Sequence, residues 1–409
     1  MGRCQTQSTR LDEVRFFRVG LSPVQRTTKA GSRMQNFTFF WDGLVETPAP
    51  KRILISGYYG FGNTGDEAIL SALLQLLRRS FNTRITVISA HPQRTAREHG
   101  VHSIGRLNPL SIVQAIAGTD LLISGGGGLL QDVTSSRSLL YYLSIIRLGC
   151  CKPRQTVLLA QSIGPIRTPL GRRLTAQTLE RVDLITVRDE ASAQELVNLG
   201  VTTPPVVVTA DLALLLERSS PERESELLAS FGLESEPFLL FCLRRLKNQS
   251  FPLDLFVTLA RRTSQKFGTR ALFLPFQTSF DLPLARALHE AVPGSVFIPA
   301  PLVPSDLISL FSRAQMVVGM RLHSLIFAAK ARTPFLPLAY DPKVTAFARL
   351  FDLEALTFAD LTETIFFGKI AQVWENRLKM RENIAKQVEL LERKAEENWA
   401  CLKRLVPDL

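Results

Sequence analysis

The chain has 409 residues, of which 45% are hydrophobic and 21% charged, a balance that excludes an acidic disordered protein and predicts a soluble globular one with about two domains. Lys and Arg outnumber Asp and Glu by 49 to 37, and the resulting charge of +12 favours an anionic partner. The five cysteines form no Cys-x-x-Cys pair, which excludes a zinc module or disulfide scaffold and favours the cytoplasm. No apolar run approaches the roughly 20 residues needed to cross a bilayer.

The first part of the chain is basic and lacks periodicity. Residues 1–33 carry seven basic side chains and two acidic ones among many Ser, Thr, Gln and Arg residues. This composition is typical of a disordered leader, which we assign to residues 1–50, with Met34 as an alternative start. An arm that binds a membrane or a partner is the alternative interpretation.

From residue 51 onwards, short apolar segments alternate with amphipathic ones. The pattern predicts strands over 52–56, 84–89, 120–124, 155–160 and 184–187, and helices over 67–79, 138–148 and 170–181. Strands that alternate with helices are typical of a parallel sheet covered on both faces. We therefore expect a Rossmann-like domain over 51–216 that holds the acceptor. The polar, turn-rich segment 217–235 is the expected linker.

A second series of the same kind follows the linker. Strands are predicted over 238–242, 270–274, 295–298, 316–319 and 335–339. They indicate a second Rossmann-like domain over 236–361, on the donor side, followed by helices over 362–409. The predicted fold class is α/β, with two doubly wound domains facing a cleft. In such sheets ligands bind outside the carboxyl ends of the strands.

A glycine-rich loop follows the first strand, and residues 60–65 read Gly-Phe-Gly-Asn-Thr-Gly. This matches the dinucleotide fingerprint, but no acidic residue ends the next strand to bind a ribose. Asp66 and Glu67 follow at the helix start, where carboxylates would repel a pyrophosphate. The loop instead offers Gly60, Asn63, Asp66 and Glu67 to a hydroxyl-rich ligand, although Asp66 is equally suited to capping the helix.

A second glycine run, 125–128, directly follows a predicted strand. Gly126 and Gly127 would let a ligand or a helix approach the backbone closely. Asp132 follows a few residues later. A tight turn needs one or two glycines, so four of them favour a site.

His323 stands after an apolar strand and at the start of a predicted helix, two residues beyond Arg321. A histidine in an apolar run is often only a core residue, but a buried arginine needs an anionic partner. Together they indicate an anion site with a proton donor. Lys343 follows the next strand, and Arg188 ends a strand of the other domain, so both are candidate ligand-binding cations.

Basic residues are also concentrated over 144–182, where Glu180 is the single acidic residue. A solvated face is the plainest interpretation of such a run. Aromatic residues are not interleaved with the charges, which disfavours nucleic acid. Contact with an anionic membrane surface is the more plausible function.

Six sequence blocks, in order, resemble the bacterial polysaccharide pyruvyl transferases, most closely the CsaB type. They are 57–67 (GYYGFGNTGDE), 124–132 (SGGGGLLQD), 161–165 (QSIGP), 187–189 (VRD), 321–323 (RLH) and 340–343 (YDPK). The similarity extends over about residues 51–355 and does not include the basic leader.

The resemblance implies transfer of a pyruvyl group from phosphoenolpyruvate to a sugar of a cell-surface polysaccharide or its lipid-linked precursor, with a GT-B-like fold. It implies that His323 is the general acid and that Arg321, Lys343 and Arg188 bind phosphate and carboxylate. Asp66 or Asp132 would then accept the hydroxyl proton. We expect no metal and no cofactor, with phosphoenolpyruvate as co-substrate. The expected location is the cytoplasm, with peripheral contact at the inner face of the plasma membrane.

Two other functions remain open at this point. A GT-B glycosyltransferase could hold the diphosphate of a nucleotide sugar with the same cations. A non-enzymatic protein that binds glycans or membranes would use the basic surface alone.

Overall fold

The computed structural model describes residues 50–79, 82–133, 135–151, 154–246, 251–299 and 301–407. These residues belong to one compact unit, Pro48–Leu409. The predicted leader lies outside the described residues except for Pro50. None of the helices within the described ranges is long and apolar enough to span a bilayer.

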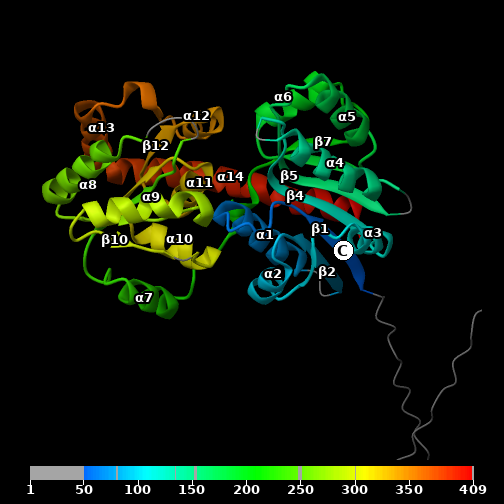
Figure 1. Ribbon diagram of the computed structural model, residues 1–409, viewed down its shortest axis with the longest axis horizontal. Coiled ribbons are helices and arrows are strands. Elements are labelled where there is room, and N and C mark those ends of the chain that lie inside the picture. The colour runs from blue at the N-terminus through cyan, green and yellow to red at the C-terminus, as the bar shows by residue number, and fades with distance from the viewer. Residues whose placement is uncertain are drawn as a thin grey trace, which may run out of the picture. The chain divides into compact units, whose positions relative to one another are not determined.

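The N-terminal half is built on a seven-stranded parallel sheet of order β3-β2-β1-β4-β5-β6-β7 (Figure 1). Its strands are β1 (Lys51–Ser56), β2 (Thr83–Ser89), β3 (His102–Gly105), β4 (Leu121–Leu130), β5 (Gln155–Ile163), β6 (Leu184–Val187) and β7 (Val206–Val208). Chain order reverses between β1 and β4, the place where a doubly wound sheet opens a crevice at its carboxyl edge.

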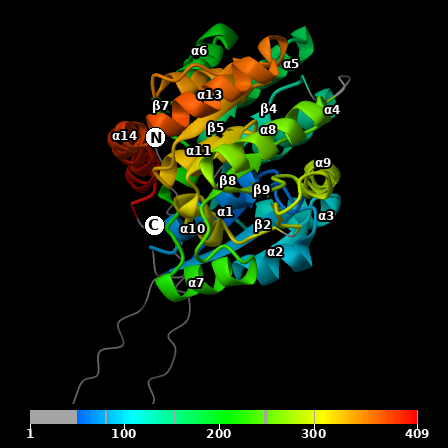
Figure 2. The ribbon, with the colours of Figure 1, turned by 90° about the vertical axis from the view of Figure 1, so that its left-hand side faces the viewer.

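The C-terminal half repeats this arrangement and faces the viewer in Figure 2. Its six parallel strands have the order β10-β9-β8-β11-β12-β13, with the switch between β8 and β11. They are β8 (Phe238–Cys242), β9 (Arg270–Phe273), β10 (Val296–Phe297), β11 (Met316–Gly319), β12 (Phe335–Ala339) and β13 (Leu356–Thr357).

Helices cover both faces of the N-terminal sheet because successive residues of its strands point to opposite faces and the side chains on both faces are apolar. Leu54 and Leu122 pack under α3 (Pro109–Ala117) and α4 (Ser136–Gly149). Ile53 and Ile123 face the other way, towards α1 (Thr64–Leu77). The layer of α3 and α4 continues with α5 (Pro169–Leu179) and α6 (Glu190–Leu199), which pack on β5 and β6.

The other helices complete the two halves. They are α2 (Pro92–His99), α7 (Pro221–Ser230), α8 (Leu253–Phe267), α9 (Thr278–Ala291), α10 (Pro304–Arg313), α11 (Leu322–Lys330), α12 (Pro342–Arg349), α13 (Glu363–Glu375) and α14 (Arg377–Leu405), with short 3₁₀ turns η1 (Leu212–Leu215) and η2 (Phe358–Asp360).

The long helix α14 connects the two halves. It starts in the C-terminal half and runs along the N-terminal one (Figure 1). The buried Asn398 anchors it there: its Oδ1 accepts from the Oγ1 of Thr186 and, at 3.0 Å, from the Oγ1 of Thr209. Its Nδ2 donates to the carbonyl of Ala210 at 3.2 Å. These contacts bind the C-terminal segment to the N-terminal sheet.

The predicted α/β class with two parallel sheets is confirmed, with differences at particular elements. The glycine run 125–128 lies inside β4 instead of after it, because extended backbone continues to Leu130. The short strands β3, β7 and β13 were not predicted. Helix α7 occupies part of the segment expected to be a linker.

Candidate functional site

The cavity that collects the predicted site residues has a volume of about 650 Å³ and opens at the carboxyl ends of both sheets. Asn63, Asp66, Arg188, Arg321, His323 and Lys343 all line it. This position, at the two switch points, is where doubly wound sheets bind ligands.

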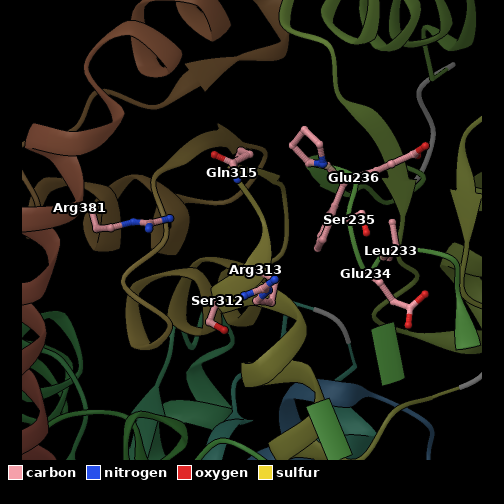
Figure 3. A pocket seen from close by; sticks show the side chains of 10 residues that line it. Leu233, Glu234, Ser235, Glu236, Ser312, Arg313, Gln315 and Arg381 are labelled. Carbon is pink, nitrogen blue, oxygen red and sulfur yellow. The ribbon is translucent and has the colours of Figure 1, made fainter. Parts of the chain in front are cut away.

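Two other cavities lie at the opposite, amino edges of the sheets. The one in Figure 3, about 340 Å³ in volume, is lined by residues around the start of β8, including Glu234, Glu236, Arg313 and Arg381. The other, about 1100 Å³, adjoins the starts of β1 and β5. Neither contains a residue that the sequence motifs single out, so we take the carboxyl-edge cavity as the candidate site.

The loop before α1 joins the two halves beside this cavity. The amide of Thr64 donates to the carbonyl of Phe276 at 2.9 Å, and the amide of Thr278 donates to the carbonyl of Gly62 at 3.3 Å. Asn63 and Gln277 form an antiparallel bridge between these bonds. The backbone of the glycine loop is therefore engaged with the C-terminal half instead of forming a phosphate cradle.

His323, in the first turn of α11, reaches across to the N-terminal half. Its ring lies so close to Gly65 that a Cβ there would fall 2.1 Å from Nδ1. Its Nε2 is 3.6 Å from Oδ2 of Asp211, and the side chain is 15% exposed. The imidazole thus lines the cavity, with a carboxylate behind it.

Asp211 is the partner that sequence reasoning missed. It caps η1 by accepting from the amide of Ala213 at 3.0 Å, and it accepts from Nη1 of Arg188 at 2.7 Å. Burial opposes ionisation of Asp211, but the charges of His323 and Arg188 hold its pKa well below the usual range. An ionised Asp211 stabilises a protonated imidazole, the role of the acid in a catalytic His–Asp pair.

Asp66 lies in the first turn of α1 and is 8% exposed. Burial, reinforced by nearby carboxylates, raises its pKa to about 7, despite the opposing effect of His323 and Arg188. His323 therefore lies near two carboxyls of different kinds: Asp211, behind the imidazole, stays ionised, and Asp66, in the cavity wall, titrates near neutrality. Such a separation is typical of groups with different proton-transfer roles.

Lys343, in the first turn of α12, also crosses to the N-terminal half. Its Nζ lies 3.4 Å from the position that a Cβ on Gly128 would take. Burial and the nearby Arg188 lower the pKa of Lys343. Two cations that repel each other in a partly enclosed site favour the binding of an anion between them.

Arg321 lines the cavity but is already paired. Its Nε and Nη2 donate to the fully buried Asp281 at 2.5 and 2.8 Å. The resemblance assigns Arg321 to phosphate and carboxylate binding, but the sequence does not identify Asp281 as its partner. The structure adds Arg244 and Arg245, which follow β8 and line the cavity; the guanidinium of Arg244 lies 4.3 Å above the ring of Tyr340. The sequence signal for these two residues is an Arg-Arg pair that follows the predicted strand 238–242 after one residue.

Gly60 and Glu67, predicted to bind substrate, brace the loop and are not among the residues that line the cavity. The amide of Gly60 donates to Oε1 of Glu67 at 2.8 Å, and Oε2 of Glu67 lies 3.7 Å from Nε2 of His99. Gly60 has a φ of +81°, and a Cβ there would collide with the Oγ of Ser89.

Asp132, the other candidate base, is also used structurally. Its two carboxylate oxygens accept from the amides of Arg167 and Thr168, each at 2.8 Å, and from the Oγ1 of Thr168 at 2.6 Å. These hydrogen bonds outweigh the effect of burial and lower its pKa. Of the two candidate bases, Asp66 alone lines the cavity.

The glycines of β4 accommodate a helix more than a ligand. A Cβ on Gly126 would fall 2.7 Å from Cγ2 of Ile69, a residue of α1. Gly127 has a φ of +83°, and a Cβ there would lie 2.8 Å from Oδ1 of Asp66. Gly128 is the glycine of the run that lines the cavity.

Within the described ranges, no group of His, Cys, Asp and Glu side chains is arranged to hold a metal ion.

Comparison with known proteins gives one family and one fold. The family model described as polysaccharide pyruvyl transferase matches residues 63–342. No curated protein matches by sequence.

Among solved structures, S. aureus MnaA with UDP aligns with a TM-score of 0.63 at 13% identity, over 88% of this chain and 98% of that one. Anabaena HepE with UDP and glucose aligns with a TM-score of 0.59 at 12% identity, over 88% and 100%. A putative UDP-N-acetylglucosamine 2-epimerase from Listeria monocytogenes gives 0.58 at 14%, over 87% and 96%. These likenesses show a GT-B-like fold.

Proposed function

Because the chain belongs to the polysaccharide pyruvyl transferase family, we propose that it moves the pyruvyl group of phosphoenolpyruvate onto a sugar of a cell-surface polysaccharide or its lipid-linked precursor. The products are a cyclic pyruvate ketal and phosphate. The motif likeness to the CsaB type extends the proposal to a cell-wall polymer of the kind that anchors an S-layer.

The charges of the cavity suit this donor. Phosphoenolpyruvate carries up to three negative charges, and several cations must converge to bind it. Lys343 and Arg188 approach each other at one wall, and Arg244 lies over Tyr340 at another. We assign phosphate and carboxylate of the donor to these cations. Arg188 is also paired, but it donates to Asp211 through Nη1 alone, whereas Arg321 gives both Nε and Nη2 to Asp281 and is assigned to holding the start of α11 in place.

The proton transfers follow from the pairing of His323 with Asp211. Protonated His323 gives its proton to the methylene carbon of the donor, while a sugar hydroxyl attacks the adjacent carbon and Asp66 takes the hydroxyl proton. The C–O bond to phosphate then breaks. A second hydroxyl attacks the same carbon, gives its proton to the now neutral imidazole of His323 and closes the ketal. Asp66 passes the proton that it took to the departing phosphate, so both groups return to their starting states. Asp211 stays ionised throughout and stabilises the imidazolium.

The observation that carries the proposal is that His323, Asp66 and Lys343 meet in one cavity although they come from different halves of the chain. The test is to incubate the protein with phosphoenolpyruvate and a glycan acceptor in D₂O. We expect phosphate release and a ketal whose methyl group has gained one deuterium. Absence of phosphate release, together with sugar transfer from a nucleotide sugar, would contradict the proposal.

His323→Ala removes the proposed acid. We expect phosphate release to fall by about 10²–10⁴-fold, the usual contribution of general acid–base catalysis, while donor binding measured by calorimetry changes little. His102→Ala is the matched control, because His102 is exposed on β3. Equal activity of wild type and His323→Ala would exclude His323 as the acid.

A further inference from the structure

The N-terminal half presents large apolar side chains to solvent on the layer formed by α3, α4 and α5. Leu107 is 83% exposed, Leu110 67%, Leu170 62% and Leu140 43%. Isolated exposed leucines are ordinary, but these lie on, or in the case of Leu107 just before, neighbouring helices of one layer.

All of these residues belong to the same edge of the sheet. The strands β3, β4 and β5 are parallel, and α3, α4 and α5 each begin shortly after the strand that precedes them. The residues at the beginnings of these helices therefore gather at the carboxyl edge, where the cavity opens. We call this surface the rim; it comprises Leu107, Leu110, Arg137, Leu140, Arg167 and Leu170.

The rim is continuous with the cavity wall. Tyr58, which lines the cavity, stacks on Phe61 with ring centroids 4.0 Å apart. The guanidinium of Arg106 lies 5.1 Å from the Phe61 ring centroid and 4.5 Å from that of Tyr141. Leu107 follows Arg106 directly, so a chain of aromatic and basic contacts leads from the cavity to the exposed leucines.

The layer also carries many basic side chains, and each of its acidic side chains already has a partner. Across residues 105–181 the acidic side chains are Asp120, Asp132 and Glu180. Asp120 pairs with Arg52, while Asp132 and Glu180 accept hydrogen bonds from backbone amides. On the rim, the exposed Arg137 and Arg167 form no ion pair with the described part of the chain, and neither do Arg147, Arg173 and Arg181, which lie farther along or just beyond α4 and α5. Exposed leucines among unpaired arginines complement the headgroups and upper acyl chains of an anionic bilayer.

We propose that the rim docks this protein onto an anionic phospholipid surface, with the mouth of the cavity facing the headgroups. The docking stands on the surface residues alone. Its consequence for catalysis rests on the proposed function: a lipid-linked acceptor would reach the cavity along the bilayer surface without leaving it.

The test is co-sedimentation of the full chain with vesicles of phosphatidylglycerol and, separately, of phosphatidylcholine. The variant Leu107→Glu/Leu110→Glu places two carboxylates on the rim. We expect its binding to phosphatidylglycerol vesicles to fall by about tenfold or more, and wild type to bind phosphatidylcholine more weakly. The matched control is Val197→Glu/Leu378→Glu, which makes the same charge change at side chains that are 67% and 69% exposed elsewhere. It should bind like wild type.

Retained vesicle binding by the rim variant, or an equal loss in the control, would overturn the proposal. A change in oligomeric state by light scattering with unchanged vesicle binding would show that the rim contacts another protein molecule instead. The assay contains no donor or acceptor, so its result is independent of the proposed function. Phosphate release with a water-soluble acceptor should be the same in wild type and rim variant, which separates failure of docking from failure of catalysis.

Discussion

At the scale of single residues, Asp66 and Asp211 both lie near His323 but have very different pKa values. Asp211 has a pKa held low by its cationic partners, while burial raises the pKa of Asp66 to about 7. Asp66 therefore takes up a proton in the folded state more readily than in the unfolded chain. Its contribution to stability is complete below about pH 4 and is lost as the pH rises through 7.

Asp66→Asn should therefore stabilise the protein at pH 8 but not at pH 4. A shift of about three pKa units corresponds to at most about 4 kcal/mol, so the free energy of unfolding at pH 8 should rise by a few kcal/mol. Urea denaturation at both pH values measures this. The same variant should lose phosphate release at every pH, because the amide accepts no proton.

Asp132→Asn is the control with the opposite sign, since hydrogen bonds lower the pKa of Asp132 and the variant should be less stable at pH 8. A variant of Asp66 less stable than wild type at pH 8 would show that the buried carboxylate is better compensated than we infer.

The sequence could indicate His323, Arg188, Lys343 and Asp66 because each stands where a strand ends or a helix begins. It could not indicate Asp211, because β7 is three residues long and its side chains show no alternation that would mark a strand. Nor could it show that Arg321 pairs with Asp281, forty positions away, since that contact exists only once α9 and α11 are packed. Residues at element ends are visible in a sequence, whereas their partners depend on tertiary structure.

At the scale of elements, the start of α1 and the start of α11 are held against each other with one glycine between them. Gly65 leaves room for the imidazole of His323, because a Cβ would fall 2.1 Å from Nδ1. The sequence pattern predicts ligand contact for Gly60 of this loop; in the structure, Gly60 and Gly65 allow a loop and a helix end to approach closely. The same holds for Gly126, over which Ile69 of α1 packs.

Gly65→Ala should move His323 without unfolding the protein, since alanine favours a helix and Gly65 lies within α1. A displacement of about 1 Å at a catalytic group can cost about 100-fold in rate, and we expect phosphate release to fall by that order. Gly368→Ala is the matched control: it lies in α13, and apart from its chain neighbours and the backbone of its own helix turn, no atom lies within 4 Å of the position that its new Cβ would take. Full activity of Gly65→Ala would mean that the imidazole can work from another position.

At the scale of the whole described unit, α14 contributes to stability across both halves. The apolar strands and the charged C-terminal helix could be predicted from composition and from the spacing of apolar residues. The return of α14 to the N-terminal sheet could not. It depends on a buried polar residue, Asn398, in an otherwise charged helix.

Asn398→Leu should destabilise the protein by about 2–4 kcal/mol, because the hydroxyl of Thr209 and the carbonyl of Ala210 lose a buried partner. Thermal unfolding followed by circular dichroism measures the change. Asn383→Leu, at an exposed position of the same helix, should stay within about 0.5 kcal/mol of wild type. Equal stability of the two variants would show that α14 is held by apolar contacts alone.

The division of the reacting groups between two halves has a protective consequence. His323 and Lys343 belong to the C-terminal half, while Asp66 and Asp211 belong to the N-terminal one, and hydrogen bonds between residues 62–64 and 276–278 hold the two sets in contact. Any movement that parted the halves would separate His323, the proposed acid, from its counter-ion Asp211, and Asp66, the proposed base, from Lys343. The proposed donor site is also shared, because Arg188 comes from the N-terminal half and Lys343 and Arg244 come from the C-terminal one, so an activated enol phosphate would react only while the halves stay together.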